Sequence, residues 1–403
     1  MAGLDPLELA CGIPLGLAQS VPALRIRGER ASDSPAQGPL RALEEVCLRC
    51  LRRPPCLVSF SGGRDSSVVL AIATAVARRE GLQDPIPATN RFGSVGESDE
   101  TAWQELVVAH LRLRDWQRVE LTTELDVVGR LAREVVAHHG VLPPFNGHFH
   151  APLLALARGG SLLTGIGGDE LFEPTHRAAL ARVLLGRRAP NRRLLRGAAL
   201  AAMPRALRRR IARREPAFDR FTWLTDDALA RLRDRYAGFE TAEPISYRRS
   251  LATWWWPSRL LQTNLAAKRL LARDFDAQIA HPLAAPEVLI AYGAARGALG
   301  PPGRRWALRE LAGELLPAEL IERETKSAFA AAFWTVTARE FANSWGGEGI
   351  DPAVVDADRL RQEWRREQPD PHTFLLIQSA LPEAQPGRHL VGTGHPEHDK
   401  GDE

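Results

Sequence analysis

Short apolar runs alternate with amphipathic stretches through the first two-fifths of the chain. The amphipathic stretches place apolar residues at every third or fourth position, which predicts helices, for example over residues 40–53, 64–81 and 125–138. Strands that alternate with helices favour an α/β fold with a doubly wound parallel sheet. Residues 220–340 read as largely helical, so we predict a helical C-terminal part. The apolar runs predict strands at residues 56–60, 86–92, 116–121 and 161–164.

The first strand runs into the sequence Ser-Gly-Gly-Arg-Asp-Ser-Ser at 61–67, where a helical pattern begins. Glycines at such a turn let the backbone approach an anion, and the helix N-terminus directs free N–H groups at it. The serines add hydroxyl donors. The Asp65 carboxylate would repel a phosphate unless a cation lies between them, so its presence implies Mg²⁺. The spacing differs from that of a kinase-type P-loop.

A second strand, at 161–164, runs into Gly-Ile-Gly-Gly-Asp-Glu at 165–170. Neighbouring parallel strands present their turns at the same carboxyl edge of a sheet, where open α/β sheets bind ligands. We therefore expect Asp65 and Asp169 to converge on one metal–pyrophosphate complex. Either turn alone is moderate support for this chemistry, and the pair is strong support.

The bulk composition is that of a globular protein with a large core in two lobes: 403 residues, 44% hydrophobic and 25% charged. No 18-residue apolar run and no basic signal segment occur, so we expect no membrane span and a cytoplasmic location. Four cysteines fit a reducing compartment. Cys47 and Cys50 form a C-x-x-C on a predicted amphipathic helix, and we expect core or half-exposed helix thiols rather than a zinc site.

Residues 177–214 contain thirteen arginines and no acidic residue, whereas the whole chain has a net charge of +4. Apolar residues recur between the arginines, so we predict a helical insertion that is either solvated or docks an acidic partner. Positive charge elsewhere is also almost all arginine, and Lys268, Lys326 and Lys400 are the only lysines. The expected organisation is an N-terminal extension (1–44), a main domain that contains the insertion (45–385) and a polar tail (386–403).

Three motifs in order suggest a family. They are the turns at 61–66 and 165–170 and the sequence Leu-Pro-Ala-Glu-Leu-Ile-Glu-Arg-Glu-Thr-Lys-Ser-Ala-Phe at 316–329. Together they resemble the synthetase domain of glutamine-dependent asparagine synthetases, which are PP-loop ATP pyrophosphatases related to β-lactam synthetases and lasso-peptide cyclases. The segment His281-Pro282-Leu283 is less similar to the corresponding part of that domain. The resemblance covers roughly residues 45–380.

The resemblance implies an adenine nucleotide alpha hydrolase-like fold and a two-step reaction. A small-molecule or peptide carboxylate attacks the α-phosphorus of ATP, and ammonia or an amine then displaces AMP. It implies Mg²⁺ at Asp65 and Asp169, and Lys326 as the catalytic residue on the reacting phosphate. The residues that would bind ATP or pyrophosphate are Ser61, Gly62, Gly63, Asp65, Ser66 and Ser67 in the first turn, with Gly165, Gly167 and Gly168 in the second.

The sequence departs from these families at three positions. Asparagine synthetases begin with Met-Cys and a glutaminase domain, but here Ala2 follows the first Met and about 45 residues precede the matching part, so we expect no glutaminase activity. Ile166 stands where asparagine synthetases have Glu and β-lactam synthetases have Tyr; isoleucine cannot accept a proton, so any base lies elsewhere. Arg64 replaces an apolar residue.

Two other classes of function are weighed against the ligase. A PP-loop tRNA-modifying enzyme would use residues 177–214 as its RNA-binding face. A non-catalytic scaffold would retain only the fold. The order of the three motifs favours the AMP-forming amide ligase over the first alternative, and the intact Asp65, Asp169 and Lys326 argue against the second.

Overall fold

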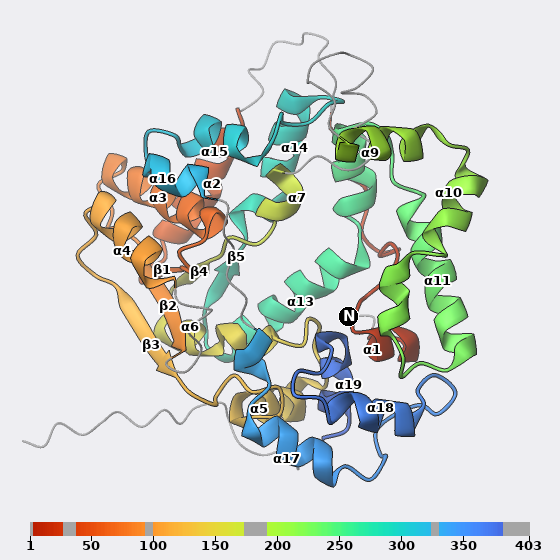
Figure 1. The fold of residues 1–403 in the computed structure, drawn as a ribbon. Coiled ribbons are helices and arrows are strands. Elements are labelled where there is room, and N and C mark those ends of the chain that lie inside the picture. Colours follow the sequence, from red (N-terminus) through yellow and green to blue (C-terminus); the bar gives the residue numbers. More distant parts are fainter. Residues whose placement is uncertain (1–2, 27–37, 93–99, 173–191, 324–329, 382–403) are drawn as a thin grey trace, which may run out of the picture.

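A single parallel sheet lies at mid-height in the left half of the computed structural model as drawn in Figure 1. The structure describes residues 3–26, 38–92, 100–172, 192–323 and 330–381. Within them the five strands lie in the order β3-β2-β1-β4-β5, all parallel. The predicted α/β, doubly wound class is confirmed. The strands are β1 (Cys56–Ser59), β2 (Ile86–Phe92), β3 (Gln117–Leu121), β4 (Ser161–Leu163) and β5 (Gln278–Ala280).

The two faces of the sheet are both covered by helices, which explains why the central strands β1 and β4 are largely apolar and buried. On β1, Val58 packs into the core beneath α2 and α3, whereas Leu57 faces the opposite core with α6 and α13. Leu163 and Leu162 on β4 alternate in the same way. The covering helices are α2 (Pro39–Leu51), α3 (Arg64–Arg79), α14 (Pro286–Arg296) and α15 (Arg304–Ala312) on one face and α6 (Ala151–Leu156) and α13 (Arg259–Asp274) on the other.

A second, helical lobe has its own core around the buried Trp223 and Trp364. The short helix α1 (Pro6–Cys11), from the segment predicted as an extension, is part of it, since Trp223 Nε1 donates to the Ala10 carbonyl at 2.8 Å. The lobe also contains α11 (Asp226–Glu240), α17 (Val336–Ser344), α18 (Ala357–Trp364) and α19 (Phe374–Ser379).

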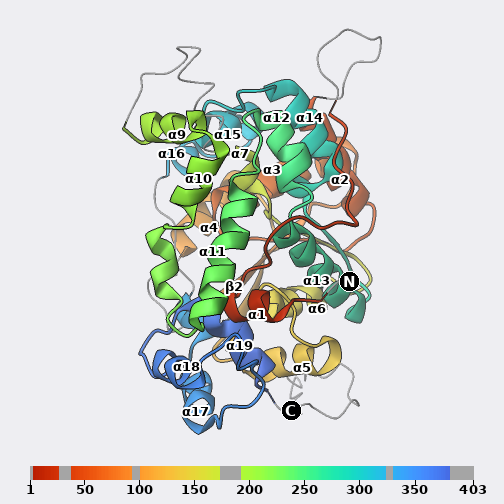
Figure 2. The same cartoon turned by 90° about the vertical axis from the view of Figure 1, so that its right-hand side faces the viewer.

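Other helices connect these layers. Figure 2 shows α9 and α10 leading into α11 along one edge of the molecule. No helix among the described ranges combines the length and the apolar character that crossing a bilayer requires. The remaining helices are α4 (Thr101–His110), α5 (Arg130–His139), α7 (Gly168–Phe172), α9 (Arg192–Ala202), α10 (Arg205–Ala212), α12 (Tyr247–Ser250) and α16 (Ala318–Glu322).

Two expectations about secondary structure were wrong. The helix predicted from residue 125 begins only at Arg130, because the buried Asp126 carboxylate accepts from the amides of Val128 and Thr335 (2.9 and 2.8 Å) and so stabilises a turn instead. Strand β5 lies in a region predicted as helical. Its three residues are too few to show a period, and it exists because it pairs with β4.

The four cysteines are free and buried, which for Cys47 and Cys50 is the core alternative of the prediction. Cys47 and Cys50 lie on α2, in the core between this helix and the sheet. Burial raises the pKa of Cys47 well above its ordinary value and that of Cys50 to about 11. Thiols in this state are poor nucleophiles, which argues against the sulfur chemistry of some PP-loop enzymes.

Candidate functional site

The turn between β1 and α3 has the geometry of an anion-binding loop. Gly62 has φ +78°, which side chains other than glycine rarely adopt, and Gly63 caps the start of α3. The amides of the first turn of α3 have no partners within the helix. Ser61 Oγ accepts from the Gly63 amide at 3.2 Å and lies 3.1 Å from Ser66 Oγ, so both hydroxyls border this helix N-terminus.

The remaining residues of this turn have different positions. Ser67 is fully buried and donates to the Gly63 carbonyl at 2.8 Å, so its hydroxyl stabilises the turn. Gly62 lies behind the loop, where a Cβ would come within 2.8 Å of the Gln104 side chain. Of the six residues predicted here, Ser61, Gly63, Asp65 and Ser66 line a cleft, and Gly62 and Ser67 shape the turn that forms it.

The second glycine turn, after β4, interlocks with the first because β4 and β1 are neighbours. A Cβ on Gly165 would lie 2.7 Å from the Ser66 amide nitrogen, and one on Gly168 would lie 2.6 Å from both carboxylate oxygens of Asp65. Gly167 has φ +101°. Only glycines allow this approach, so the spacing of the motif is explained by backbone contact between the two turns.

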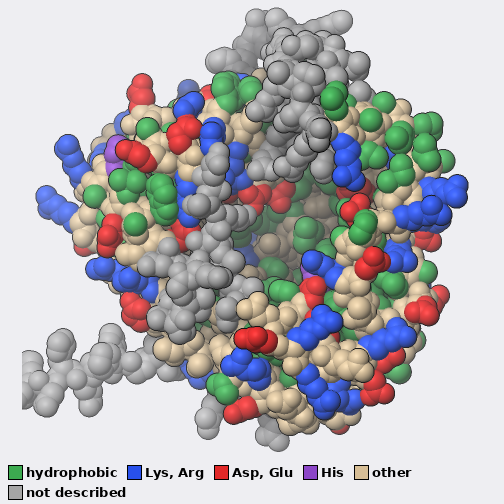
Figure 3. Space-filling model, in the orientation of Figure 1, with side chains coloured by type: hydrophobic (Ala, Val, Ile, Leu, Met, Phe, Trp, Pro, Cys, Tyr) green, Lys and Arg blue, Asp and Glu red, His purple; other side chains and the backbone are tan. Residues whose placement is uncertain are grey.

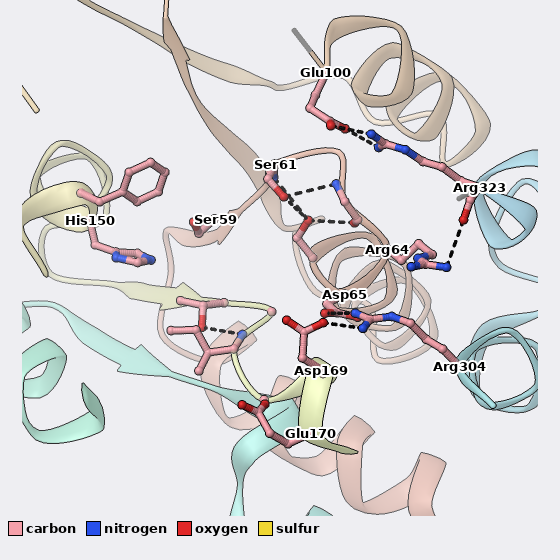
Figure 4. Close-up of a pocket in the computed structure, with 18 residues that line it drawn as sticks. Ser59, Ser61, Arg64, Asp65, Glu100, His150, Asp169, Glu170, Arg304 and Arg323 are labelled. Carbon is pink, nitrogen blue, oxygen red and sulfur yellow. Dashed lines mark hydrogen bonds and ion pairs between the residues drawn. The ribbon is translucent and has the colours of Figure 1, made fainter. Parts of the chain in front are cut away.

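Both turns open into one cleft with a volume of about 570 Å³, visible as a hollow in Figure 3. It lies between the carboxyl ends of β1 and β4. From β1 the chain continues to β2 and β3 on one side of the sheet, whereas β4 and β5 lie on the other side of β1, so the strand order reverses between β1 and β4. In open α/β sheets such a switch point is where ligands bind. The cleft runs from the two acidic turns past Ser59 to Phe149 and His150 (Figure 4).

Asp65 and Asp169 converge in this cleft, as the motif pair predicts, and a guanidinium joins them. Arg304, at the start of α15, donates to Asp65 Oδ2 and, at 2.5 Å, to Asp169 Oδ1 (Figure 4). Burial raises the pKa of the Asp65 carboxyl, whereas the Arg304 charge acts in the lowering direction. The two carboxylates therefore share one cation across a short gap.

The same residues fit a divalent cation. Asp65 Oδ1 is buried and has no hydrogen-bond partner among the described residues. Hard cations such as Mg²⁺ bind carboxylate oxygens, commonly one or two together with phosphate oxygens. Asp65 and Asp169 would hold such a cation, and Arg304 lies between the two carboxylates.

A buried ion pair closes the other side of the cleft. Arg323 donates to both carboxylate oxygens of Glu100, one contact being 2.5 Å, and each side chain is only 5% exposed. The Arg323 carbonyl accepts from Arg64 at 3.0 Å. Arg64, an anomaly in the sequence, thus ties the anion-binding turn to the segment that precedes residue 324.

Several features of the site were not found from the sequence. Lys326, predicted as catalytic, lies outside the described residues, although Arg323, three positions earlier, lines the cleft. Ile166 lines it too. Arg304, Arg323, Glu100 and His150 were missed: the partners of the two arginines lie over 130 residues away in the chain, and arginine is too common here to stand out.

The fold and the two interlocked glycine turns define an α/β protein with a cleft at its switch point, lined by a helix N-terminus and by the carboxylates of Asp65 and Asp169. The family model described as asparagine synthase matches residues 41–377, and the chain belongs to this family. The family supports an ATP-dependent synthetase that forms carbon–nitrogen bonds. No curated protein matches the chain.

Proposed function

We propose that the protein is an AMP-forming amide ligase that adenylates a carboxylate and transfers the acyl group to ammonia or an amine. In the first step a carboxylate oxygen bonds to the α-phosphorus of ATP, and the bond from this phosphorus to the bridging oxygen breaks, releasing pyrophosphate. In the second step the amine nitrogen bonds to the acyl carbon, AMP leaves, and the amine loses a proton to a base.

The observation that carries this proposal is the contact between the two turns: Gly168 packs on the Asp65 carboxylate, and Asp65 and Asp169 face one gap beside the N-terminus of α3. A Mg²⁺ held by these carboxylates would neutralise the pyrophosphate as it departs. The α3 amides and the hydroxyls of Ser61 and Ser66 would hold the phosphate oxygens.

We also propose that Lys326 contacts the reacting phosphate, as the family resemblance implies. The support from the described residues is that Arg323, three residues earlier, is anchored in the cleft wall by Glu100. Ile166, in the second turn, lines the cleft and has no titratable group. The proton of the amine must therefore leave through another group.

Exchange of labelled pyrophosphate into ATP tests the first step, because adenylation is reversible before the amine attacks. The purified chain is incubated with ATP, Mg²⁺ and labelled pyrophosphate against a panel of carboxylic acids, without amine. We expect label in ATP with at least one acid, and AMP as the nucleotide product when an amine is added. Release of ADP and phosphate instead would contradict the proposal.

A further inference from the structure

Two histidines and an aspartate lie together at a point where two helices end. His138 and His139 are the last residues of α5, and Asp274 is the last residue of α13. His139 Nε2 lies 2.6 Å from Asp274 Oδ2, and His138 Nε2 lies 3.8 Å from Oδ1 of the same carboxylate. One ligand atom from each residue lies within 4.8 Å of the other two. We call these three residues the histidine cluster.

The histidine cluster is separate from the cleft. Asp274 comes just before β5, so it lies at the amino edge of the sheet, whereas the cleft lies at the carboxyl ends of β1 and β4. The Asp276 carbonyl accepts from the Gly159 amide at 3.1 Å, just before β4 begins, which holds the end of α13 at this edge. None of the three residues lines the cleft, so the proposed reaction does not explain why they are together.

The partners of Asp274 are unusual for this chain. Its side chain is only 14% exposed, and a carboxylate in such a position needs a partner. Arginine fills this role for Glu100 and for Asp65, but among the described residues no arginine or lysine pairs with Asp274. Imidazole nitrogens and a carboxylate therefore face one another here with no guanidinium between them.

A hydrogen bond accounts for only one of the two histidines. The 2.6 Å contact of His139 is a hydrogen bond, whereas the 3.8 Å distance of His138 is too long for one. The His138 ring nevertheless stands edge-on to that of His139, with the centroids 4.4 Å apart, and its Nε2 is beside the second carboxylate oxygen. Bonds of about 2.0–2.1 Å in a tetrahedral zinc site place two ligand atoms about 3.3 Å apart. The two observed distances lie on either side of this spacing, so small side-chain rotations bring all three donors to it.

The surrounding backbone also favours a cation. The last carbonyls of a helix have no partner within the helix and carry a partial negative charge. Both α5 and α13 end at the cluster, and the Asp274 carboxylate adds a full negative charge. Imidazole nitrogens select zinc and related transition-metal ions, whereas Mg²⁺ prefers oxygen ligands.

We propose that the histidine cluster binds a zinc ion. The protein ligands are Nε2 of His138, Nε2 of His139 and one carboxylate oxygen of Asp274, and water takes the remaining position. Each imidazole then carries its proton on Nδ1, and the metal displaces any proton from Nε2.

Such an ion would fasten the end of α5 to the end of α13. Helix α5 packs on α19 of the helical lobe, and α13 packs on β5 of the sheet. The metal would therefore join the two parts of the molecule at the edge opposite the cleft, and its expected role is structural.

A zinc titration of the full, untagged chain tests the site. Zn²⁺ is added in competition with a chromogenic chelator, with Mg²⁺ in excess to occupy the carboxylates of the cleft. The wild type should bind one Zn²⁺ more per chain than His138→Gln, because loss of a direct ligand should weaken binding at the cluster by at least about 100-fold. His138→Gln should fold normally, since the His138 side chain is 59% exposed.

His110→Gln is the matched control. His110 is exposed and is the last residue of α4, but it belongs to no metal-binding group among the described residues. This variant should bind zinc as the wild type does. Co²⁺ in place of Zn²⁺ should give the visible absorption of a four-coordinate site in the wild type and in His110→Gln. The thiolate charge-transfer band should be absent, because all four cysteines are buried.

Thermal unfolding supplies a second readout. Zinc should raise the unfolding midpoint of the wild type and of His110→Gln but not that of His138→Gln, because a ligand that binds only the folded chain stabilises it. Zinc binding that is absent from the wild type, or equal in the wild type and His138→Gln, would overturn the proposal. Neither measurement involves ATP or pyrophosphate, so both decide the zinc site even where the proposed ligase activity fails.

Discussion

Arg304 and Arg323, which line the cleft, differ from the arginines on α10 in burial and in pairing. Arg304 and Arg323 are buried against carboxylates of distant segments, with side-chain exposures of 11% and 5%. On α10 no residue is buried, and Arg209 and Arg210 have no ion-pair partner among the described residues. The apolar residues of the helix, Leu207 and Ile211, are exposed beside them.

This difference shows that pairing, rather than charge density, identifies the arginines that build the site. The most arginine-rich segment attracts attention in the sequence, yet the cleft is closed by two arginines from less basic parts of the chain. A buried pair holds two segments in a fixed relation, because separating it would leave a charge in a poorly solvated position. An exposed arginine on a helix contributes mainly to the long-range field.

The largest effect is expected at the two carboxylates that Arg304 joins. Asp65→Asn and Asp169→Asn should each reduce pyrophosphate exchange by roughly 1,000-fold, because a neutral amide is a weak ligand for Mg²⁺. Asp358→Asn, at an 86% exposed carboxylate on α18, is the control and should leave exchange unchanged. Either cleft variant with full activity at limiting Mg²⁺ would disprove the metal assignment.

The buried and exposed ion pairs should differ in their effect on folding. Glu100→Gln should lower the free energy of unfolding by roughly 3–5 kcal/mol, because Arg323 is left as a buried charge. Asp234→Asn removes the partner of Arg213, and both side chains of this pair are nearly half exposed. This variant should change the free energy of unfolding by only about 0–1 kcal/mol. Urea denaturation measures both; equal losses would mean that burial is not what separates the two regions.

Lys268 is buried like the cleft arginines but has no carboxylate partner among the described residues. Its charge should therefore lower the free energy of unfolding, whereas the paired charges raise it. Its pKa is about 8 in the folded protein against an ordinary 10.5, so the unfolded chain binds more protons between these values and stability rises with pH there. Below pH 8 Lys268 is charged in both states, and its burial lowers the free energy of unfolding by the full amount of roughly 3 kcal/mol.

Lys268→Met should therefore stabilise the protein at pH 7, and this advantage should shrink as the pH rises through 8 toward 10.5. The variant retains the neighbouring His148, His150, His281 and Arg269. Burial lowers the pKa of the three histidines below the ordinary 6.5, so they are neutral in this pH range and do not add to the comparison. Thermal unfolding of both proteins across this pH range is the measurement. An advantage that does not change with pH would show that burial does not shift the pKa of Lys268.

Arg304 should have a smaller effect on activity than the carboxylates it joins. Arg304→Met removes a positive charge beside the phosphate site, and exchange should fall by roughly 100-fold. Binding of Mn²⁺ to the ATP-free protein should tighten in the same variant, because the cation that competes for Asp65 and Asp169 is gone. Arg214→Met, which removes an exposed charge beyond α10, should change neither quantity.

The sequence predicts the parts of this molecule whose causes are local. The strands β1, β2 and β4 follow from apolar runs, and the first turn follows from its glycines and the helix pattern after it. The convergence of Asp65 and Asp169 was predictable because adjacent parallel strands end at one edge. The start of α5 was not predictable, because Asp126 accepts hydrogen bonds from a segment 209 residues away.

The cleft walls illustrate the same limit. Arg304 and Arg323 act through partners that are distant in the chain, and nothing local marks them among fifty arginines. His281 was noticed only as an imperfect match to a family segment. Its surroundings depend on Thr164 and Lys268, which the strand order β1-β4-β5 and the packing of α13 bring close.

Replacing the arginines of α10 should have the smallest effect on folding and activity. The experiment tests whether these exposed arginines bind a partner. We propose that this helix docks an acidic partner, since the exposed Leu207 and Ile211 add apolar contact area beside unpaired cations. The residues to change are Arg209, Arg210 and Arg214, because Arg208 is half-buried and donates to the Thr241 carbonyl.

Replacing these three arginines by Gln should weaken binding of a polyglutamate peptide several-fold at low salt, and the difference should vanish as salt rises. Folding should change by less than about 0.5 kcal/mol, and ATP affinity should be unchanged, because none of the three lines the cleft. A single-stranded RNA that binds where the peptide does not would identify a nucleic-acid surface instead. Wild-type and variant proteins that bind both probes equally at every salt concentration would show that the arginines only solvate the helix.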